Sequence, residues 1–109
     1  MAPMKFSWKE WLPWRRWRIG LLVEAADEIP DKLPPRLAVL VGTHEKPKWL
    51  AFNCPCGDDH RIMVTLDPNN RPHWRVTGTD RISLWPSVDA WRGDRRCHYI
   101  VRNGKIIWT

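Results

Sequence analysis

The sequence contains no long apolar run. No stretch approaches the roughly 20 apolar residues that a helix needs to span a bilayer. The N-terminal segment has tryptophans interrupted by proline and arginine where a signal peptide has a continuous apolar core. We therefore expect no membrane span, and a cytoplasmic location is the default. At 109 residues we expect one small domain. Such a domain buries only about two-thirds of its unfolded surface and is helped by an added cross-link.

The chain has few cysteines, and they are odd in number. The three cysteines, Cys54, Cys56 and Cys97, cannot all pair within one molecule. In a cytoplasmic protein, closely spaced cysteines indicate metal or redox chemistry before a disulfide framework. The segment Cys-Pro-Cys-Gly at 54–57 lacks the two-residue spacing of the common redox dithiol, and its proline and glycine favour a tight loop. We therefore expect a structural zinc site; three buried, reduced thiols are the competing interpretation.

The fourth zinc ligand has several candidates. Cys97 brings the third thiolate from a distant segment, and structural zinc usually takes four cysteine or histidine ligands. His60 is the first choice because it can fold back within the cysteine loop. His98 is the main alternative, although neighbouring side chains in a strand point to opposite faces. The remaining candidates are Asp58, Asp59 and His44.

Acidic residues are also rare in residues 1–20, which carry four of the six net positive charges. Four tryptophans recur there at intervals of three, and Pro13 disfavours a long helix. These tryptophans are Trp8, Trp11, Trp14 and Trp17. Such a segment can bind nucleic acid, an anionic membrane or an acidic protein. We prefer the simpler interpretation that residues 1–18 form an arm whose indoles pack on the domain of residues 19–109.

Short strands are predicted for most of the chain, with little helix. Three prolines within 25–36 predict a connection containing one helical turn. Asn103-Gly104 is typical of a type I′ hairpin turn. The remaining five tryptophans are expected mainly in the core. We predict a mainly β, small single domain of short antiparallel strands and hairpins, with strands at 19–24, 37–41, 49–53, 61–66, 73–77, 81–85, 98–101 and 105–108.

Five segments together resemble a bacterial protein family. They are EAADEIPDKL at 24–33, FNCPCGDDHRI at 52–62, LDPNNRPHWRV at 66–76, ISLWPSVDAW at 82–91 and CHYIVRNGKIIW at 97–108. The resemblance is to the BubE-like proteins, which are encoded beside bacterial ubiquitin-like conjugation genes and proposed to act as peptidases. It covers roughly residues 20–108. This chain has Arg95 where the family commonly has a cysteine, and Cys97 where it commonly has a serine.

The resemblance implies a serine-type peptidase or deconjugase. Ser87 and His98 match the family's Pro-Ser and histidine positions, which makes Ser87 the expected nucleophile and His98 the expected general base. Glu28 is the first choice for the third member, with Glu24 and Asp89 as alternatives. A zinc hydrolase, in which the metal activates water, ranks lower because three thiolates favour a closed site.

The implied substrate is the C-terminal linkage of a bacterial ubiquitin-like protein. The implied partners are that protein, its conjugates and the conjugating enzymes of the same operon. Several arginines can form a basic face toward an acidic tail of the modifier: Arg75, Arg92, Arg95 and Arg96. The competing hypothesis is a non-catalytic zinc-containing module that binds nucleic acid or protein through the Trp-rich arm.

Overall fold

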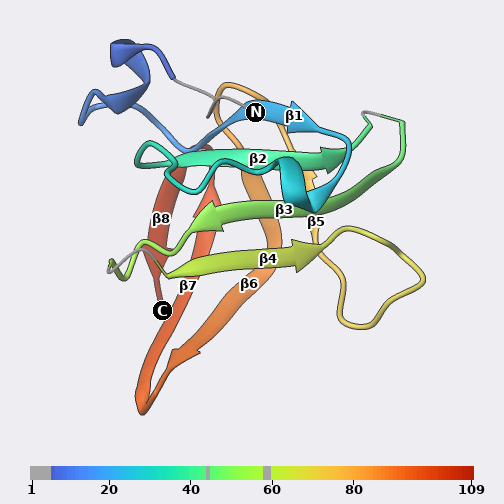
Figure 1. Cartoon of the computed structure of the whole chain (residues 1–109). Coiled ribbons are helices and arrows are strands. Elements are labelled where there is room, and N and C mark those ends of the chain that lie inside the picture. The colour runs from blue at the N-terminus through green and yellow to red at the C-terminus, as the bar shows by residue number, and fades with distance from the viewer. Residues whose placement is uncertain (1–5, 44, 58–59) are drawn as a thin grey trace.

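Two four-stranded β-sheets build the fold, in the orders β1-β2-β3-β4 and β5-β6-β7-β8 (Figure 1). The computed structural model describes residues 6–43, 45–57 and 60–109. The first sheet contains β1 Arg18–Val23, β2 Leu37–Gly42, β3 Pro47–Asn53 and β4 Arg61–Thr65. The second contains β5 Arg75–Thr77, β6 Ser83–Arg92, β7 Arg95–Arg102 and β8 Lys105–Trp108. The prediction of a mainly β domain is confirmed.

The central strand β2 is buried over its whole length because its sequence, LAVLVG, is apolar on both faces. Leu40 belongs to the core between the two sheets, whereas Val39 and Val41 belong to a second cluster on the other face. β2 pairs antiparallel with β3 but parallel with β1, so our expectation of antiparallel pairing was wrong for this pair. The connection at 24–36, which contains the 3₁₀ turn η2 Ala26–Glu28, is long enough for that crossover.

The main core lies where the sheets meet, with the strands of one sheet running across those of the other (Figure 1). Leu50 and Phe52 of β3 pack there with Leu84, Tyr99 and Val101 of the second sheet. All five side chains are almost completely buried. The cysteine loop after β3 and the strand β7 therefore lie at the edge of a single core, which is what allows distant cysteines to meet.

The hairpin of β6 and β7 is longer than the sequence predicted, because β6 continues to Arg92 and β7 begins at Arg95. The alternation of Val88 and Ala90, both buried, with exposed Asp89 is a strand pattern that our assignment missed. The turn into β8 has Asn103 and Gly104 at φ +49° and +78°. Positive φ at both positions is what a type I′ turn requires.

The tryptophans outside the arm are mostly not core residues, contrary to our prediction. Trp85, Trp91 and Trp108 are 61%, 57% and 57% exposed, and Trp49 is 37% exposed. Only Trp74 packs partly buried against the core. Aromatic residues favour strands whichever face they occupy, so composition alone did not separate the solvent face from the core face.

Two arginines fix the N-terminal arm through backbone carbonyls. Buried Arg18 donates hydrogen bonds to the carbonyl oxygens of Glu10 (2.7 Å) and Pro35 (3.1 Å). Arg36 donates to the carbonyl oxygens of Arg15 and Pro13, both at 2.7 Å. The arm contains one 3₁₀ turn, η1 Trp8–Trp11. No helix of the described ranges is long and apolar enough to cross a membrane.

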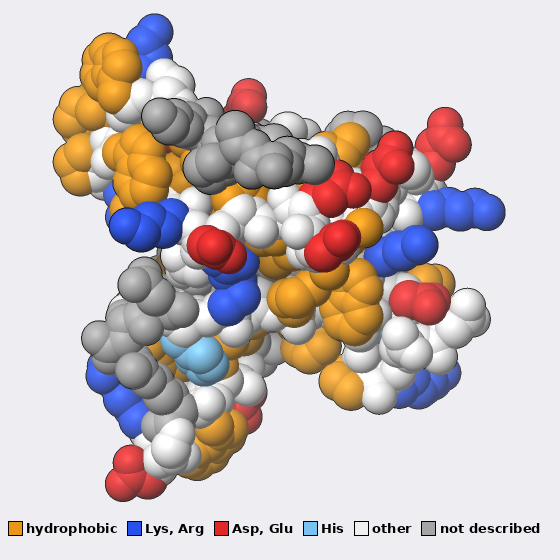
Figure 2. All heavy atoms as spheres, in the orientation of Figure 1, with side chains coloured by type: hydrophobic (Ala, Val, Ile, Leu, Met, Phe, Trp, Pro, Cys, Tyr) orange, Lys and Arg blue, Asp and Glu red, His pale blue; other side chains and the backbone are white. Residues whose placement is uncertain are grey.

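Of the four arm indoles, only Trp17 packs into the core, edge-on against Phe52 with ring centroids 5.5 Å apart. Trp8 and Trp14 are 69% and 70% exposed. Figure 2 shows hydrophobic side chains gathered at the upper left, where the N-terminal arm lies in Figure 1. The expected packing of the arm indoles therefore holds for Trp17 and not for these two. The domain boundary after residue 18 stays a prediction.

The contrast between two arm tryptophans gives a stability test. Trp17→Ala is expected to lower the free energy of unfolding by about 3–5 kcal/mol, because it leaves a large cavity between β3 and the arm. Trp14→Ala, the matched control, should change it by less than about 0.5 kcal/mol. Urea titration followed by circular dichroism measures both. Equal losses for the two variants would contradict the assignment of Trp17 to the core.

Candidate active site and metal centre

Ser87 and His98 meet on the outer face of the second sheet. Ser87 Oγ lies 2.9 Å from His98 Nε2, within hydrogen-bond distance. A bulge in β6 places the serine: from Leu84 to Val88 the strand advances four residues while β7 advances two. The backbone carbonyl of Ser87 accepts a hydrogen bond from Trp74 Nε1 at 3.3 Å. Both side chains are half-buried.

The neighbours Cys97 and His98 serve different sites because β7 is regular. Burial alternates along β7, with Cys97 and Tyr99 turned into the core. His98 therefore points to the opposite face. Both of its ring nitrogens lie against side-chain hydroxyls, so the structure does not support His98 as a metal ligand.

Sequence reasoning missed Thr109, which lies at the second nitrogen of His98. Thr109 Oγ1 is 2.6 Å from His98 Nδ1, and the Thr109 backbone N–H donates to the His98 carbonyl at 3.1 Å. The position of the hairpin turn in the sequence could have identified Thr109 as a neighbour of His98. The register that pairs Tyr99 with Trp108 places the residue that follows β8 beside His98. Counting outward from Asn103-Gly104 would have identified it.

The structure does not bring Glu28 to this pair. Glu28 lies exposed in η2, and Glu24 lies exposed just after β1, both in the connection between strands of the first sheet. Asp89 is much closer, since it pairs with His98 across β6 and β7.

The carboxylate of Asp89 is engaged by Arg96, whose Nε and Nη2 lie 2.8 and 2.9 Å from its two oxygens. This hydrogen bonding and the positive charge of Arg96 hold the pKa of Asp89 below its usual range. Asp89 is therefore a charged neighbour of His98 and not its hydrogen-bond partner.

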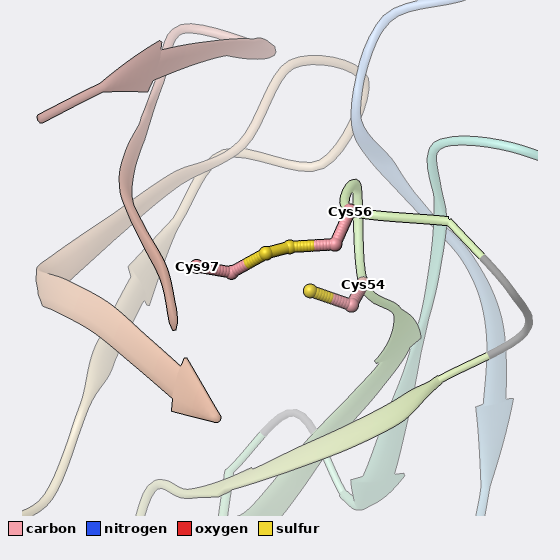
Figure 3. A group of neighbouring side chains, drawn as sticks. All are labelled: Cys54, Cys56 and Cys97. Carbon is pink, nitrogen blue, oxygen red and sulfur yellow. A yellow bond between two sulfur atoms is a disulfide. The ribbon is translucent and has the colours of Figure 1, made fainter. Parts of the chain in front are cut away.

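The three cysteines converge at the edge of the core. Their Sγ atoms all lie within 4.8 Å of one another. Figure 3 shows Cys54 and Cys56 reaching from the loop after β3, and Cys97 reaching from β7. Cys56 and Cys97 are joined there as a disulfide, with the buried Cys54 thiol beside them. With the Cys56–Cys97 bond absent, the same three sulfur atoms could instead hold a metal ion as thiolates.

A buried phenol lies beside Cys54. The Tyr99 hydroxyl lies 3.6 Å from Cys54 Sγ. Burial raises the pKa of Tyr99 above its usual value, so the phenol keeps its proton and can donate it to the sulfur. The loop is closed by the Cys54 N–H bond to the His60 carbonyl at 2.7 Å. Gly57 adopts φ +100°, which a residue with a Cβ rarely does.

The predicted fourth ligand is not part of this cluster. Among the described residues, the atoms that gather are the three sulfurs alone, and the His60 ring nitrogens are not with them. His60 is nevertheless half-buried in the same loop. The further candidates Asp58, Asp59 and His44 lie outside the described residues.

Comparison with known proteins identifies the family to which the chain belongs. A family model described as "Bacterial ubiquitination-like system serine protease (BubE)" matches residues 25–109. The chain belongs to this family. The BubE match contains all three cysteines, Ser87, His98 and Thr109, and excludes the Trp-rich arm. No curated protein and no solved structure was found to match.

Proposed function

We propose that this BubE-family chain is a serine hydrolase that cleaves the C-terminal linkage of a bacterial ubiquitin-like protein. Ser87 is the nucleophile and His98 is the general base. The observation that carries the proposal is the 2.9 Å approach of Ser87 Oγ to His98 Nε2. It occurs in a chain whose family is described as serine proteases, and unrelated folds build hydrolytic sites from the same two groups.

The reaction takes two steps. Ser87 Oγ attacks the carbonyl carbon of the linkage while its proton passes to His98 Nε2. The imidazolium then gives that proton to the leaving amine or hydroxyl group as its bond to the carbonyl breaks, which leaves an acyl group on Ser87. Water, deprotonated by His98, attacks this ester, and the proton returns to Ser87 Oγ.

Thr109 acts as the positioning residue for His98. If Nε2 accepts the serine proton, Nδ1 carries the ring hydrogen and donates it to Thr109 Oγ1. The hydroxyl hydrogen of Thr109 can in turn reach the His98 carbonyl at 3.5 Å. Thr109 thus takes the orienting place that we expected Glu28 to fill.

Thr109→Val should lower kcat about 3- to 10-fold with little change in KM. The variant keeps the shape of the side chain but loses one hydrogen bond, of about 0.5–1.5 kcal/mol. Thr109→Ser retains the hydroxyl and should keep most of the rate. Steady-state kinetics of the two variants compare them directly. Equal rates for Thr109→Val and the unmodified chain would exclude a positioning role.

We further propose that the three cysteines, as separate thiolates and not as a Cys56–Cys97 disulfide, hold a structural zinc ion. His60, whose backbone carbonyl bonds the Cys54 N–H in the same loop, is the proposed fourth ligand, and its ring would have to turn toward the sulfurs. Bound there, zinc would supply a cross-link between the loop after β3 and strand β7. The sulfurs lie on the core side of β7 and His98 on the other face, which supports a role for the metal in stability and not in the reaction.

The partners that follow from the proposed function are the modifier, its conjugates and the conjugating enzymes of the same system. A cytoplasmic location fits these partners and stays a prediction. The competing hypothesis of a nucleic-acid-binding arm also stays a prediction; its supporting feature is the exposure of Trp8 and Trp14.

The proposed function is tested with a bacterial ubiquitin-like protein that carries a short peptide fused to its C-terminus. The unmodified chain should release the peptide, and mass spectrometry should place the cut at the modifier's C-terminus. Ser87→Ala should release none. Release by Ser87→Ala at the unmodified rate would exclude the serine mechanism.

A further inference from the structure

A shallow groove beside the Ser87–His98 pair is lined by arginine. It consists of two adjoining hollows, of about 250 and 420 Å³, which share Arg75 and Trp85. Arg102 lines the first hollow and Arg71 the second. No aspartate or glutamate is found among the described residues that line either hollow. We call this feature the arginine groove.

The arginine groove borders the candidate nucleophile. Pro86 lines its second hollow and is bonded to Ser87. Ile100 lines the first hollow and lies two residues from His98 in β7, so the two side chains share a face. The groove therefore ends one residue from Ser87, on the face of β7 that carries His98.

The charges of the arginine groove are available to a ligand. Arg71, Arg75 and Arg102 are exposed, and no hydrogen bond or salt bridge of these side chains is found within the part of the chain that the structure describes. Arg96 differs, because its guanidinium is held by Asp89. The indole of Trp85, 61% exposed, adds an apolar surface between the cations.

We propose that the arginine groove is the substrate subsite and binds an acidic side chain in the polypeptide segment next to the bond that is cleaved. Planar guanidinium groups bind carboxylates through paired hydrogen bonds, and a groove with no acid of its own is complementary to negative charge. The inference rests on the proposed function, because the groove is a substrate subsite only if Ser87 is the nucleophile.

Binding to two labelled peptides tests the subsite. The Ser87→Ala protein is titrated into fluorescein-labelled Gly-Glu-Gly-Glu-Gly and Gly-Gln-Gly-Gln-Gly, and anisotropy is recorded at low salt. The glutamate peptide should bind about tenfold more tightly, since hydrogen bonds to charged groups are the stronger ones. Adding Arg75→Glu or Arg102→Glu should abolish the preference. Lys48→Glu, an equal charge reversal on β3, should preserve it.

Several results would overturn the subsite. They are equal affinities for the two peptides, no detectable binding of either, or a preference that survives both arginine reversals. Tighter binding of a single-stranded oligonucleotide through the same arginines would instead assign the groove to nucleic acid. Hydrolysis of p-nitrophenyl acetate distinguishes a failure of the subsite from a failure of the proposed function. Ester hydrolysis by the unmodified chain that is lost in Ser87→Ala, together with equal affinities for the two peptides, would overturn the subsite and leave the proposed function standing. No ester hydrolysis above the Ser87→Ala background would overturn the proposed function itself.

Discussion

Ser87→Ala is expected to lower the rate of hydrolysis by at least about 10³-fold while the protein keeps its fold and metal content. Without the hydroxyl, no acyl group can form on the chain, and only residual stabilisation of the reacting carbonyl remains. The serine is half-buried beside a bulge, and alanine fits that backbone without strain. Hydrolysis of p-nitrophenyl acetate and thermal melting by circular dichroism measure the rate and the fold.

The double variant distinguishes a cooperating pair from two separate effects. His98→Ala alone should cost about as much as Ser87→Ala, because each residue acts only through the other across a 2.9 Å contact. Ser87→Ala combined with His98→Ala should then be hardly slower than either single variant, since residues that act as a unit are strongly non-additive. Ser7→Ala, an exposed serine of the arm, is the matched control and should retain full activity. Additive losses, or activity in Ser87→Ala near the control, would contradict the assignment.

Cys54→Ser is expected to remove stoichiometric zinc and to lower the melting temperature sharply. Metal binding at such a site is coupled to folding and contributes on the order of 10 kcal/mol in small zinc domains. Cys54 is the residue to change because it is a free, buried thiol whose sulfur lies beside those of Cys56 and Cys97. Metal analysis by mass spectrometry and a thermal melt are the measurements.

This variant also separates a metal centre from a disulfide. If a Cys56–Cys97 disulfide were the only cross-link, Cys54→Ser would leave it in place, and the melting temperature would change little. The unmodified protein would then show the mass deficit of a disulfide and contain no zinc. Tyr99→Phe is a milder companion variant, which removes the hydroxyl near Cys54 Sγ. It should weaken zinc binding about 10- to 100-fold without abolishing it.

Much of the fold could be predicted from local patterns. The apolar run that forms β2, the cysteine loop between β3 and β4, and the Asn103-Gly104 turn were all found in their observed places. Each depends on short-range chemistry, namely a run of buried residues or a backbone that needs positive φ. The parallel pairing of β1 with β2 was not found, because strand direction depends on the path of the whole connection and not on either strand.

The candidate sites were predictable to different degrees. The convergence of the three cysteines followed from their types and spacing, and it agrees with the cluster observed. The third member of the catalytic group could not be predicted in this way. Only carboxylates were considered for this position (Glu28 first, then Glu24 and Asp89), whereas the residue beside Nδ1 is Thr109. A hydroxyl at the end of a strand has no distinctive local pattern, and only the register of β7 and β8 identifies it.

Labelling with a fluorophosphonate, followed by peptide mapping, measures most directly whether Ser87 is an activated nucleophile. In this reagent the serine oxygen displaces fluoride from phosphorus and forms a phosphonate ester, which requires a neighbouring base to accept the hydroxyl proton. We predict a single adduct, on the peptide that contains Ser87, and none after His98→Ala. An adduct on another residue, or no adduct on a folded and zinc-loaded protein, would contradict the serine mechanism.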